Sequence, residues 1–334
     1  MRVADVGEFG LIARLQRRLE ARGVTGTPTV GIGDDAAVWP ALRFEIATTD
    51  TLVQGVHFPA EPGPWRDLGW KALAVNVSDI GAMGGAPAYA LVTLALPGDV
   101  LVSDIDELYE GLADCAAAYG VAVAGGDVVA APVVVITVAL NGWADVSEDG
   151  APLVLRRDAG RAGDLVAVTG HLGAAAGGVR ILLGAQAPPE ARAGLMLAQR
   201  RPRPRLEAGR AAVRAGVRCA IDVSDGLAQD LGHICAMSRC GAILWAEKVP
   251  VSLDLVAAFP DDALQLALTG GEDYELLFTG SETQIEAVRR AVDTPVTVVG
   301  ELTQGPPQVR VEGPGGRELR LASAGWDHFP GSRP

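Results

Sequence analysis

Residues 31–36 read GIGDDA, two glycines and two adjacent carboxylates that follow the apolar residue Val30. The spacing also fits G-x-G-x-x-A, the fingerprint of a dinucleotide-binding loop, which requires a strand before it and a helix after it. Asp34 and Asp35 argue against a dinucleotide, because two carboxylates repel a pyrophosphate unless a cation lies between them. The stretch is therefore either part of a metal site or a solvated turn, and the position of other carboxylates decides between the two.

The composition limits the possible functions. The chain has 334 residues, of which 49% are hydrophobic and 21% charged, enough for two domains with sizeable cores. A net charge of −13 argues against nucleic acid as a partner, because phosphate backbones are bound by an excess of Lys and Arg. The only lysines are Lys71 and Lys248, and neither lies in a Gly-Lys-Ser/Thr sequence, so a P-loop is excluded. A bound phosphate would need metal ions or arginines.

The segments between the motifs alternate between helical and strand patterns. We find no apolar run of the length of a membrane span and no hydrophobic signal core in residues 1–10, so we expect a cytoplasmic protein without membrane contact. The polar stretch 145–152 predicts a boundary between domains 1–145 and 146–334. The patterns predict helices over 9–22, 65–84, 103–119 (with Ser103 as N-cap), 173–184 and 282–292, and strands over 43–47, 88–97, 121–124, 133–144, 152–158, 164–170, 219–222, 296–302, 309–313 and 318–322.

Carboxylates recur at the ends of these apolar segments. The predicted strand 43–47 leads into Thr48, Thr49 and Asp50, and the strand 121–124 leads into Gly125, Gly126 and Asp127. Asp79 falls on a half-buried face of the predicted helix 65–84, where an unpaired carboxylate is rare. Together with the opening motif, six aspartates follow this pattern: Asp35, Asp50, Asp79, Asp127, Asp222 and Asp225.

Convergence of these aspartates would require cations. At about 4 Å and an effective dielectric of about 20, each like-charged pair costs roughly 4 kcal/mol. Carboxylates, waters and substrate phosphates are the oxygen ligands that Mg²⁺ prefers. The alternative is that these aspartates are turn residues and N-caps, the commoner role for a single Asp after a strand.

Three other hypotheses arise from the residues. His233, Cys235 and Cys240 could form a zinc site, although free cysteines are usually just buried. Ser224 lacks the G-x-S-x-G elbow, which argues against a serine hydrolase. The pair AVNVSDI (74–80) and AIDVSDG (220–226) hints at an internal duplication, and RRPRPR (200–205) is expected to be a solvated basic elbow.

The motifs together resemble the thiamine-monophosphate kinase family, within the aminoimidazole-ribonucleotide synthetase-like superfamily. The resemblance covers nearly the whole chain, in order: GIGDDAAV, TTDTLVQGVHF, KALAVNVSDIGAMG, GGD, DVSDGLAQDLGHI, GGEDYELLF and GWDHF. It implies an N-terminal α/β domain that dimerises through its sheet and a C-terminal α+β domain. It also implies transfer of the ATP γ-phosphate to thiamine monophosphate, giving thiamine diphosphate, at several Mg²⁺ ions in a homodimer.

By motif position, the resemblance implies a role for each site residue. Asp35, Thr48, Thr49, Asp50, Asp79, Asp127, Asp222 and Asp225 would hold metal ions. Gly126, Arg157, Ser224 and Tyr119 would contact the nucleotide, and His57, Glu272 and Trp326 would contact the thiamine substrate. The attacking group is already a phosphate, so no general base is required, and Arg157 would be the side-chain cation on the transferred charge.

Some features depart from the family pattern. Val128 stands where the family usually has Thr, and Asp158-Ala159 follows Arg157 where the family tends to have Ser-Gly. Rival interpretations are an ATP-dependent ligase of the same superfamily and a non-catalytic nucleotide or metal sensor. His57, Glu272 and the WDHF sequence favour the kinase, and the complete acidic set argues against a sensor.

Overall fold

The computed structural model describes residues 2, 11, 14–24, 44–61, 63–321 and 325. The chain divides into an N-terminal unit, Met1–Ile80 with Ala86–Pro152, and a C-terminal unit, Gly81–Gly85 with Leu153–Pro334. The division falls after Pro152, and it assigns the short segment Gly81–Gly85 to the C-terminal unit. The predicted GIGDDA site and Trp326 lie outside the described residues.

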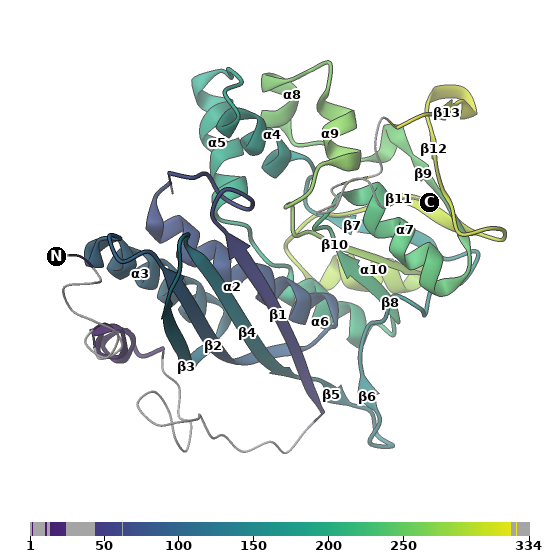
Figure 1. The fold of residues 1–334 in the computed structure, drawn as a ribbon. Helices are drawn as coiled ribbons and strands as arrows, with labels where there is room; N and C mark the ends of the chain where they lie inside the picture. The colour runs from purple at the N-terminus through teal and green to yellow at the C-terminus, as the bar shows by residue number, and fades with distance from the viewer. Residues whose placement is uncertain are drawn as a thin grey trace. The chain divides into compact units, whose positions relative to one another are not determined.

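A four-stranded sheet with order β1-β4-β2-β3 forms the N-terminal unit. Only the pair β2 and β3 is parallel, and α2 and α3 lie on the same face of the sheet (Figure 1). Val92, Leu94 and Val138 point to that face and are at most 1% exposed. The elements are β1 (Glu45–Val53), α2 (Trp65–Ala82), β2 (Ala86–Leu96), α3 (Val102–Tyr119), β3 (Ala122–Ala130), β4 (Val135–Trp143) and β5 (Asp145–Val146), and residues 14–21 are also helical.

The strand ends in this unit differ from the prediction. β1 and β3 run through Thr48–Asp50 and Gly125–Asp127, so these polar residues lie within strands rather than after them. The strands continue because pairing with neighbouring strands outweighs the turn preference of Gly and Asp. Ser103 is not the N-cap: α3 starts after Leu101, without a side-chain cap.

The C-terminal unit contains a seven-stranded sheet with order β13-β12-β9-β11-β7-β10-β8. Its pairs are antiparallel except β12 with β9. Its strands are β7 (Leu165–Thr169), β8 (Cys219–Asp222), β9 (Gly241–Trp245), β10 (Leu276–Gly280), β11 (Val296–Thr303), β12 (Val309–Glu312) and β13 (Glu318–Leu319). The short strand β6 (Pro152–Leu153) lies at the division itself and outside this sheet. Its helices are α4 (Ala174–Leu182), α5 (Pro189–Arg200), α6 (Leu206–Arg214), α7 (Leu227–Ser238), α8 (Leu253–Ala258), α9 (Ala263–Thr269), α10 (Glu282–Ala291), η1 (Ala246–Lys248) and η2 (Pro314–Gly316).

Both faces of this sheet are buried. Leu277 of β10 packs into one core with α7, whereas its neighbours Leu276 and Phe278 pack into a second core with α6 and α10. Strand residues alternate between faces, so one strand serves two cores. All four residues of β8, including Asp222 at its end, are buried, so packing on both faces of the sheet holds this strand in place.

One sequence interpretation was wrong, and a second was only partly right. AVNVSDI lies in helix α2, whereas AIDVSDG spans β8 and the following loop, so the two similar stretches are not structurally equivalent. The basic elbow is not simply solvated: Pro202 and Pro204 are buried, and Arg205 forms an ion pair with Glu275. Within the described residues, no helix combines the length and the apolar character needed to cross a bilayer.

Candidate active site

Three of the predicted metal ligands meet in the N-terminal unit. Thr48 and Asp50 alternate with Thr49 along β1, so both point to the face covered by helix α2, which carries Asp79. The hydroxyl of Thr48 donates a hydrogen bond to Oδ2 of Asp79. The sequence therefore identified a real cluster, and a strand and the helix packed on it bring its members together.

The electrostatics of this cluster favour a bound cation. Burial first, and the negative charge of Asp79 second, raise the pKa of Asp50 from 3.8 to about 6. Two half-buried carboxylates that destabilise each other's charged form are an arrangement that a hard divalent cation neutralises. Thr48, Asp50 and Asp79 thus fit a Mg²⁺ site by donor type and by charge.

Thr49 and Asp127 do not join the cluster of Thr48, Asp50 and Asp79. Thr49 lies on the face of β1 opposite Asp50, in the same row as Gly125 of β3. Asp127 pairs in register with Thr93, and its Oδ1 accepts a hydrogen bond from the N–H of Val128 at 2.9 Å. β1 and β3 form opposite edges of the sheet, about 14 Å apart across three strand spacings. Asp127 and Asp50 therefore cannot ligate one ion within a single N-terminal unit.

His57 follows β1 in a tight turn. The ring Nδ1 of His57 accepts a hydrogen bond from the backbone N–H of Val53 at 3.0 Å. The backbone N–H of His57 donates to the carbonyl of Val53 at 2.9 Å. In the neutral imidazole the proton is then on Nε2. The turn fixes both the ring and its tautomer just beyond the strand that carries Asp50.

The predicted nucleotide contacts of the N-terminal unit have structural roles as well. Tyr119, the last residue of α3, packs edge-on against Trp70 with ring centroids 6.2 Å apart. A Cβ at Gly126 would lie 1.9 Å from the carbonyl oxygen of Val92, so the pairing of β2 and β3 itself requires glycine there. The glycine is explained without a nucleotide.

Arg157 lies in the C-terminal unit and is exposed. Its carbonyl accepts a hydrogen bond from the Ser238 hydroxyl at 2.7 Å, which fixes the backbone at this point. Asp158, which departs from the family pattern, forms an ion pair with Arg156. Nε of Arg156 lies 2.8 Å from Oδ1 of Asp158. The acidic residue beside Arg157 is therefore neutralised by the other neighbouring arginine.

The second group of predicted ligands lies at the end of β8. Asp222 is the last residue of that strand and is 4% exposed, and Ser224 and Asp225 follow it in the loop before α7. Oδ2 of Asp225 accepts from Nε2 of Gln229, one turn into the helix, at 3.2 Å. The strand end, the loop and the helix start thus present two carboxylates and a hydroxyl from one short segment.

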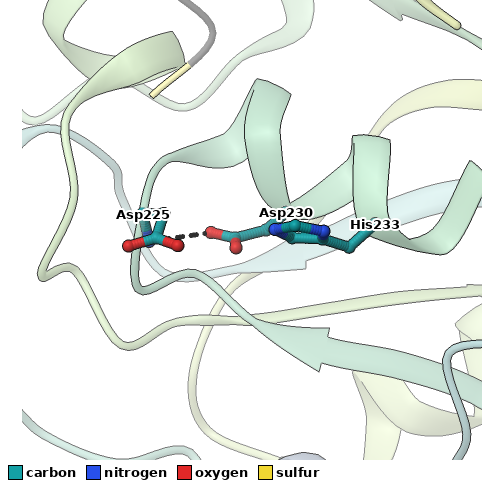
Figure 2. Close-up of side chains that lie close together, drawn as sticks. All are labelled: Asp225, Asp230 and His233. Atoms are coloured by element: carbon teal, nitrogen blue, oxygen red, sulfur yellow. Dashed lines mark hydrogen bonds between the residues drawn. The ribbon is translucent and has the colours of Figure 1, made fainter. Parts of the chain in front are cut away.

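Asp230 is an important residue that the sequence analysis missed. Oδ2 of this 1% exposed side chain accepts hydrogen bonds from the N–H groups of Ser224, Asp225 and Gly226, each at 3.1 Å. Figure 2 shows the Asp230 carboxylate between Asp225 and His233. Burial first, and then the charges of Asp222 and Asp225, raise its pKa well above the ordinary value. Asp230 therefore positions the loop that carries the predicted ligands, and an Asp in the first turn after DG was its sequence signal.

The zinc hypothesis is not supported by the position of its residues. One ligand atom each of Asp225, Asp230 and His233 lies within 4.8 Å of the others, whereas no such group among the described residues joins His233 to the cysteines. Cys235 and Cys240 are buried in the apolar core around α7. Burial raises the pKa of both thiols, so they remain protonated at neutral pH.

Glu272 lies in a strained turn before β10. Its φ of 70° and the φ of 51° at Tyr274 are both in the left-handed region that favours glycine. Oε2 of Glu272 accepts from Nε2 of Gln199 at 3.3 Å, a second contact that the sequence analysis did not anticipate. The carboxylate of Asp273 caps the start of α4 by accepting from the N–H of Gly173 at 2.6 Å.

Comparison with protein families defines the class of protein. Residues 33–144 match the AIR synthase related protein N-terminal domain, and residues 161–312 match the AIR synthase related protein C-terminal domain. The two matches cover the N-terminal sheet with its helices and most of the C-terminal unit. The chain is thus an AIR synthase related protein with both domains present.

Individual relatives narrow the assignment. The chain is 37% identical to thiamine-monophosphate kinase of Escherichia coli (strain K12), over 97% of this chain and 98% of that protein. It is 35% identical to thiamine-monophosphate kinase of Bacillus subtilis (strain 168), over 90% of this chain and 93% of that protein. A crystal structure of thiamine-monophosphate kinase from Stenotrophomonas maltophilia K279a is similar with a TM-score of 0.80, 36% identity and coverage of 94% and 98%. The chain belongs to the thiamine-monophosphate kinase family.

A solved complex extends the comparison to ligands. The structure described as AaThiL complexed with AMPPCP and TMP has a TM-score of 0.75 to this chain at 32% identity, with coverage of 98% and 99%. Hydrogenase maturation protein HypE in complex with ATP, at 19% identity and a TM-score of 0.70, shares the fold. The fold is thus common to several activities, while the close relatives are kinases.

Proposed function

We propose that this chain transfers the γ-phosphoryl group of ATP to thiamine monophosphate, giving thiamine diphosphate and ADP. The structural observation that carries this function is the Thr48, Asp50 and Asp79 cluster, in which a hydroxyl and two half-buried carboxylates offer oxygen ligands to a divalent cation. The relative AaThiL has been solved with AMPPCP and TMP, a triphosphate analogue and the acceptor. A ligase of the same superfamily is less consistent with the whole-length similarity to kinases.

We infer that Mg²⁺ ions are held by two groups of side chains. Thr48, Asp50 and Asp79 supply oxygen ligands in the N-terminal unit, and Asp222 and Asp225 supply them in the C-terminal unit. Thr49, Asp127 and Asp35 are further proposed ligands, and the separation of β1 from β3 requires more than one ion or a second copy of the sheet. Bound Mg²⁺ would neutralise the phosphate charges and stabilise the charge of the transferred group.

The side chains of this chain bind and orient the two substrates. The acceptor phosphate is largely dianionic near neutral pH, because its second pKa is about 6, so no side chain has to remove a proton. Arg157 is proposed to face the nucleotide phosphates, with Gly126, Ser224 and Tyr119 as further nucleotide contacts. Glu272 is proposed to pair with the cationic thiazolium ring or accept from the pyrimidine amino group, His57 to donate through Nε2, and Trp326 to stack on the ring.

The proposed assembly is a homodimer formed through the N-terminal sheet. In the described part of this unit, α2 and α3 both lie on one face of that sheet (Figure 1), and Thr137 and Ala139 on the other face are only partly buried. Light scattering of the Ala139→Arg variant tests this, because a monomeric variant supports the sheet as the interface. We also propose a cytoplasmic location without nucleic-acid partners, because ATP is the co-substrate, the net charge is −13 and the described cysteines are free.

A turnover assay tests the proposed function. Purified protein is incubated with ATP, MgCl₂ and thiamine monophosphate, and thiamine diphosphate and ADP are separated by chromatography. Equal amounts of the two products are expected, with none in the presence of a metal chelator. Folded protein that binds ATP and forms no thiamine diphosphate would refute the kinase and leave the sensor interpretation.

A further inference from the structure

Arg205 and Glu275 form a largely buried ion pair, and Glu275 follows Glu272 by three residues, where the turn leads into β10. Nε and Nη2 of Arg205 contact Oε2 and Oε1 of Glu275, each at 2.6 Å, and the Thr169 hydroxyl donates to Oε2 at 2.6 Å. The Glu275 side chain is 5% exposed and that of Arg205 is 24% exposed. A bidentate pair fixes direction as well as distance, because two parallel bonds allow only one relative orientation.

The surrounding backbone is shaped to fit this carboxylate. Gly170 has a φ of 60°, and a Cβ there would lie 2.0 Å from Oε1 of Glu275. The hydroxyl of Thr169 also accepts from the N–H of Leu276 at 2.8 Å, so it connects the carboxylate to the start of β10. Burial is the main cause that raises the pKa of Glu275, while Arg205 and Thr169 lower it. The Arg205 guanidinium therefore stabilises the ionised form of the buried Glu275 carboxyl group.

The turn itself needs such support. Left-handed backbone at Glu272 and Tyr274 costs free energy and persists only where the surroundings enforce it. The N–H of Glu272 donates to the carbonyl of Ser224, and the N–H of Tyr274 to that of Val223, each at 2.8 Å. These bonds join the turn to the loop that carries the proposed ligands Asp222 and Asp225.

Arg205 comes from a rigid segment. Its elbow contains the buried Pro202 and Pro204, and it leads into helix α6. That helix packs closely on the backbone at residue 81, since a Cβ at Gly209 would lie 1.9 Å from the carbonyl oxygen of Gly81. The guanidinium is therefore held from its own side by proline stiffness and helix packing.

We propose that Arg205, acting through Glu275, is a positioning residue for the thiamine substrate, and that Gln199 orients the Glu272 carboxylate on the same turn. This inference rests on the proposed function for the role of Glu272. When Arg205 no longer holds Glu275, the turn relaxes and Glu272 leaves the position that receives the cationic ring. Glu272 is not among the proposed nucleotide contacts, and the loop that carries Ser224 and Asp225 keeps its hydrogen bonds to the Asp230 carboxylate, so ATP binding changes much less than binding of thiamine monophosphate.

The experiment compares Michaelis constants for the two substrates. In Arg205→Lys, which keeps the charge and loses the bidentate geometry, KM for thiamine monophosphate rises about tenfold, as the loss of one charge-assisted hydrogen bond gives. KM for ATP stays within about twofold of wild type, which corresponds to about 0.4 kcal/mol. Glu286→Gln, which removes exposed ion pairs with Arg289 and Arg290 on α10 in the same unit, is the matched control and changes neither value.

A second variant separates positioning from stability. Arg205→Met with Glu275→Leu removes both charges, a replacement that is often neutral for stability. Its melting temperature stays near that of wild type, while KM for thiamine monophosphate remains raised and hydrogen exchange of the amides at residues 272 and 274 accelerates. Unchanged exchange, or equal effects on both KM values, would overturn the proposal. If wild-type protein does not phosphorylate thiamine monophosphate, the proposed function is wrong, and the exchange rates alone decide whether Arg205 holds the turn.

Discussion

Replacing Asp79 by Asn separates the metal role of the N-terminal cluster from a structural role. The amide oxygen of Asn still accepts the hydrogen bond from the Thr48 hydroxyl, and the volume of the side chain is unchanged. The negative charge that raises the pKa of Asp50 is lost. We therefore expect the metal-free variant to be as stable as the wild type or slightly more stable, and to have no kinase activity.

The size of the effect follows from the pKa of Asp50. A rise from 3.8 to about 6 lowers the stability of the folded state as pH increases from about 4 to about 6, by at most about 3 kcal/mol in total. Burial is the larger cause, so the part due to Asp79 is about 1 kcal/mol. In a chain of 334 residues this corresponds to roughly 2 °C or less in melting temperature.

The assay is thermal unfolding at pH 5 and pH 8, with and without MgCl₂. Without metal, wild type and Asp79→Asn melt together at pH 5, where the Asp50 carboxyl is mostly protonated in both proteins, and the variant melts slightly higher at pH 8. With Mg²⁺ at about 100 times its dissociation constant, the wild type gains about 2.7 kcal/mol. The variant gains little, because the ion has lost a charged ligand.

Two results would refute this reasoning. A metal-free variant that melts several degrees lower at pH 8 would show that Asp79 stabilises the fold through its charge. A variant with the full Mg²⁺-dependent gain would show that Asp79 is not a ligand. Glu107→Gln, which removes an exposed carboxylate from α3 in the same unit, is the control for a general effect of charge.

Three further predictions concern the C-terminal unit. Asp230→Ala leaves three loop N–H groups without their acceptor and should lose about 2–4 kcal/mol in urea unfolding, whereas Asp230→Asn keeps an acceptor oxygen and should lose less. The pKa of Asp273 is raised to about 8, chiefly by burial, so stability should fall between about pH 4 and pH 8 by at most about 1.4 kcal/mol per pH unit, and Asp273→Asn should reduce this slope. Gly209→Ala places a Cβ 1.9 Å from the Gly81 carbonyl and should lower the melting temperature, while the same change at Gly232, which has open space, should not.

Local patterns in the sequence were sufficient to predict part of the fold and of the candidate site. The stripe Leu73, Val77 and Ile80 predicts the buried face of α2, and all three side chains are fully buried. The same periodicity predicts that Asp79 is half-buried, as observed. Helical spacing is a property of neighbouring residues, so it can be read without knowing what the helix packs against.

Other features depend on contacts between residues distant in the sequence. Two similar stretches, AVNVSDI and AIDVSDG, form a helix and a strand with its loop, because packing and sheet pairing override weak local preference. The order of the strands places Asp127 at the edge opposite Asp50, which no spacing in the sequence indicates.

The sequence by itself determined the family, the helical stripes and the set of carboxylates and hydroxyls available for phosphoryl transfer. Only the tertiary structure decided which of them meet: Thr48 with Asp79, the Asp230 carboxylate with three loop N–H groups, and Arg205 with Glu275. The physical reason is that a charged group is costly to bury without a partner. Folding must therefore bring such partners together from segments whose separation along the chain carries no information about their distance in space.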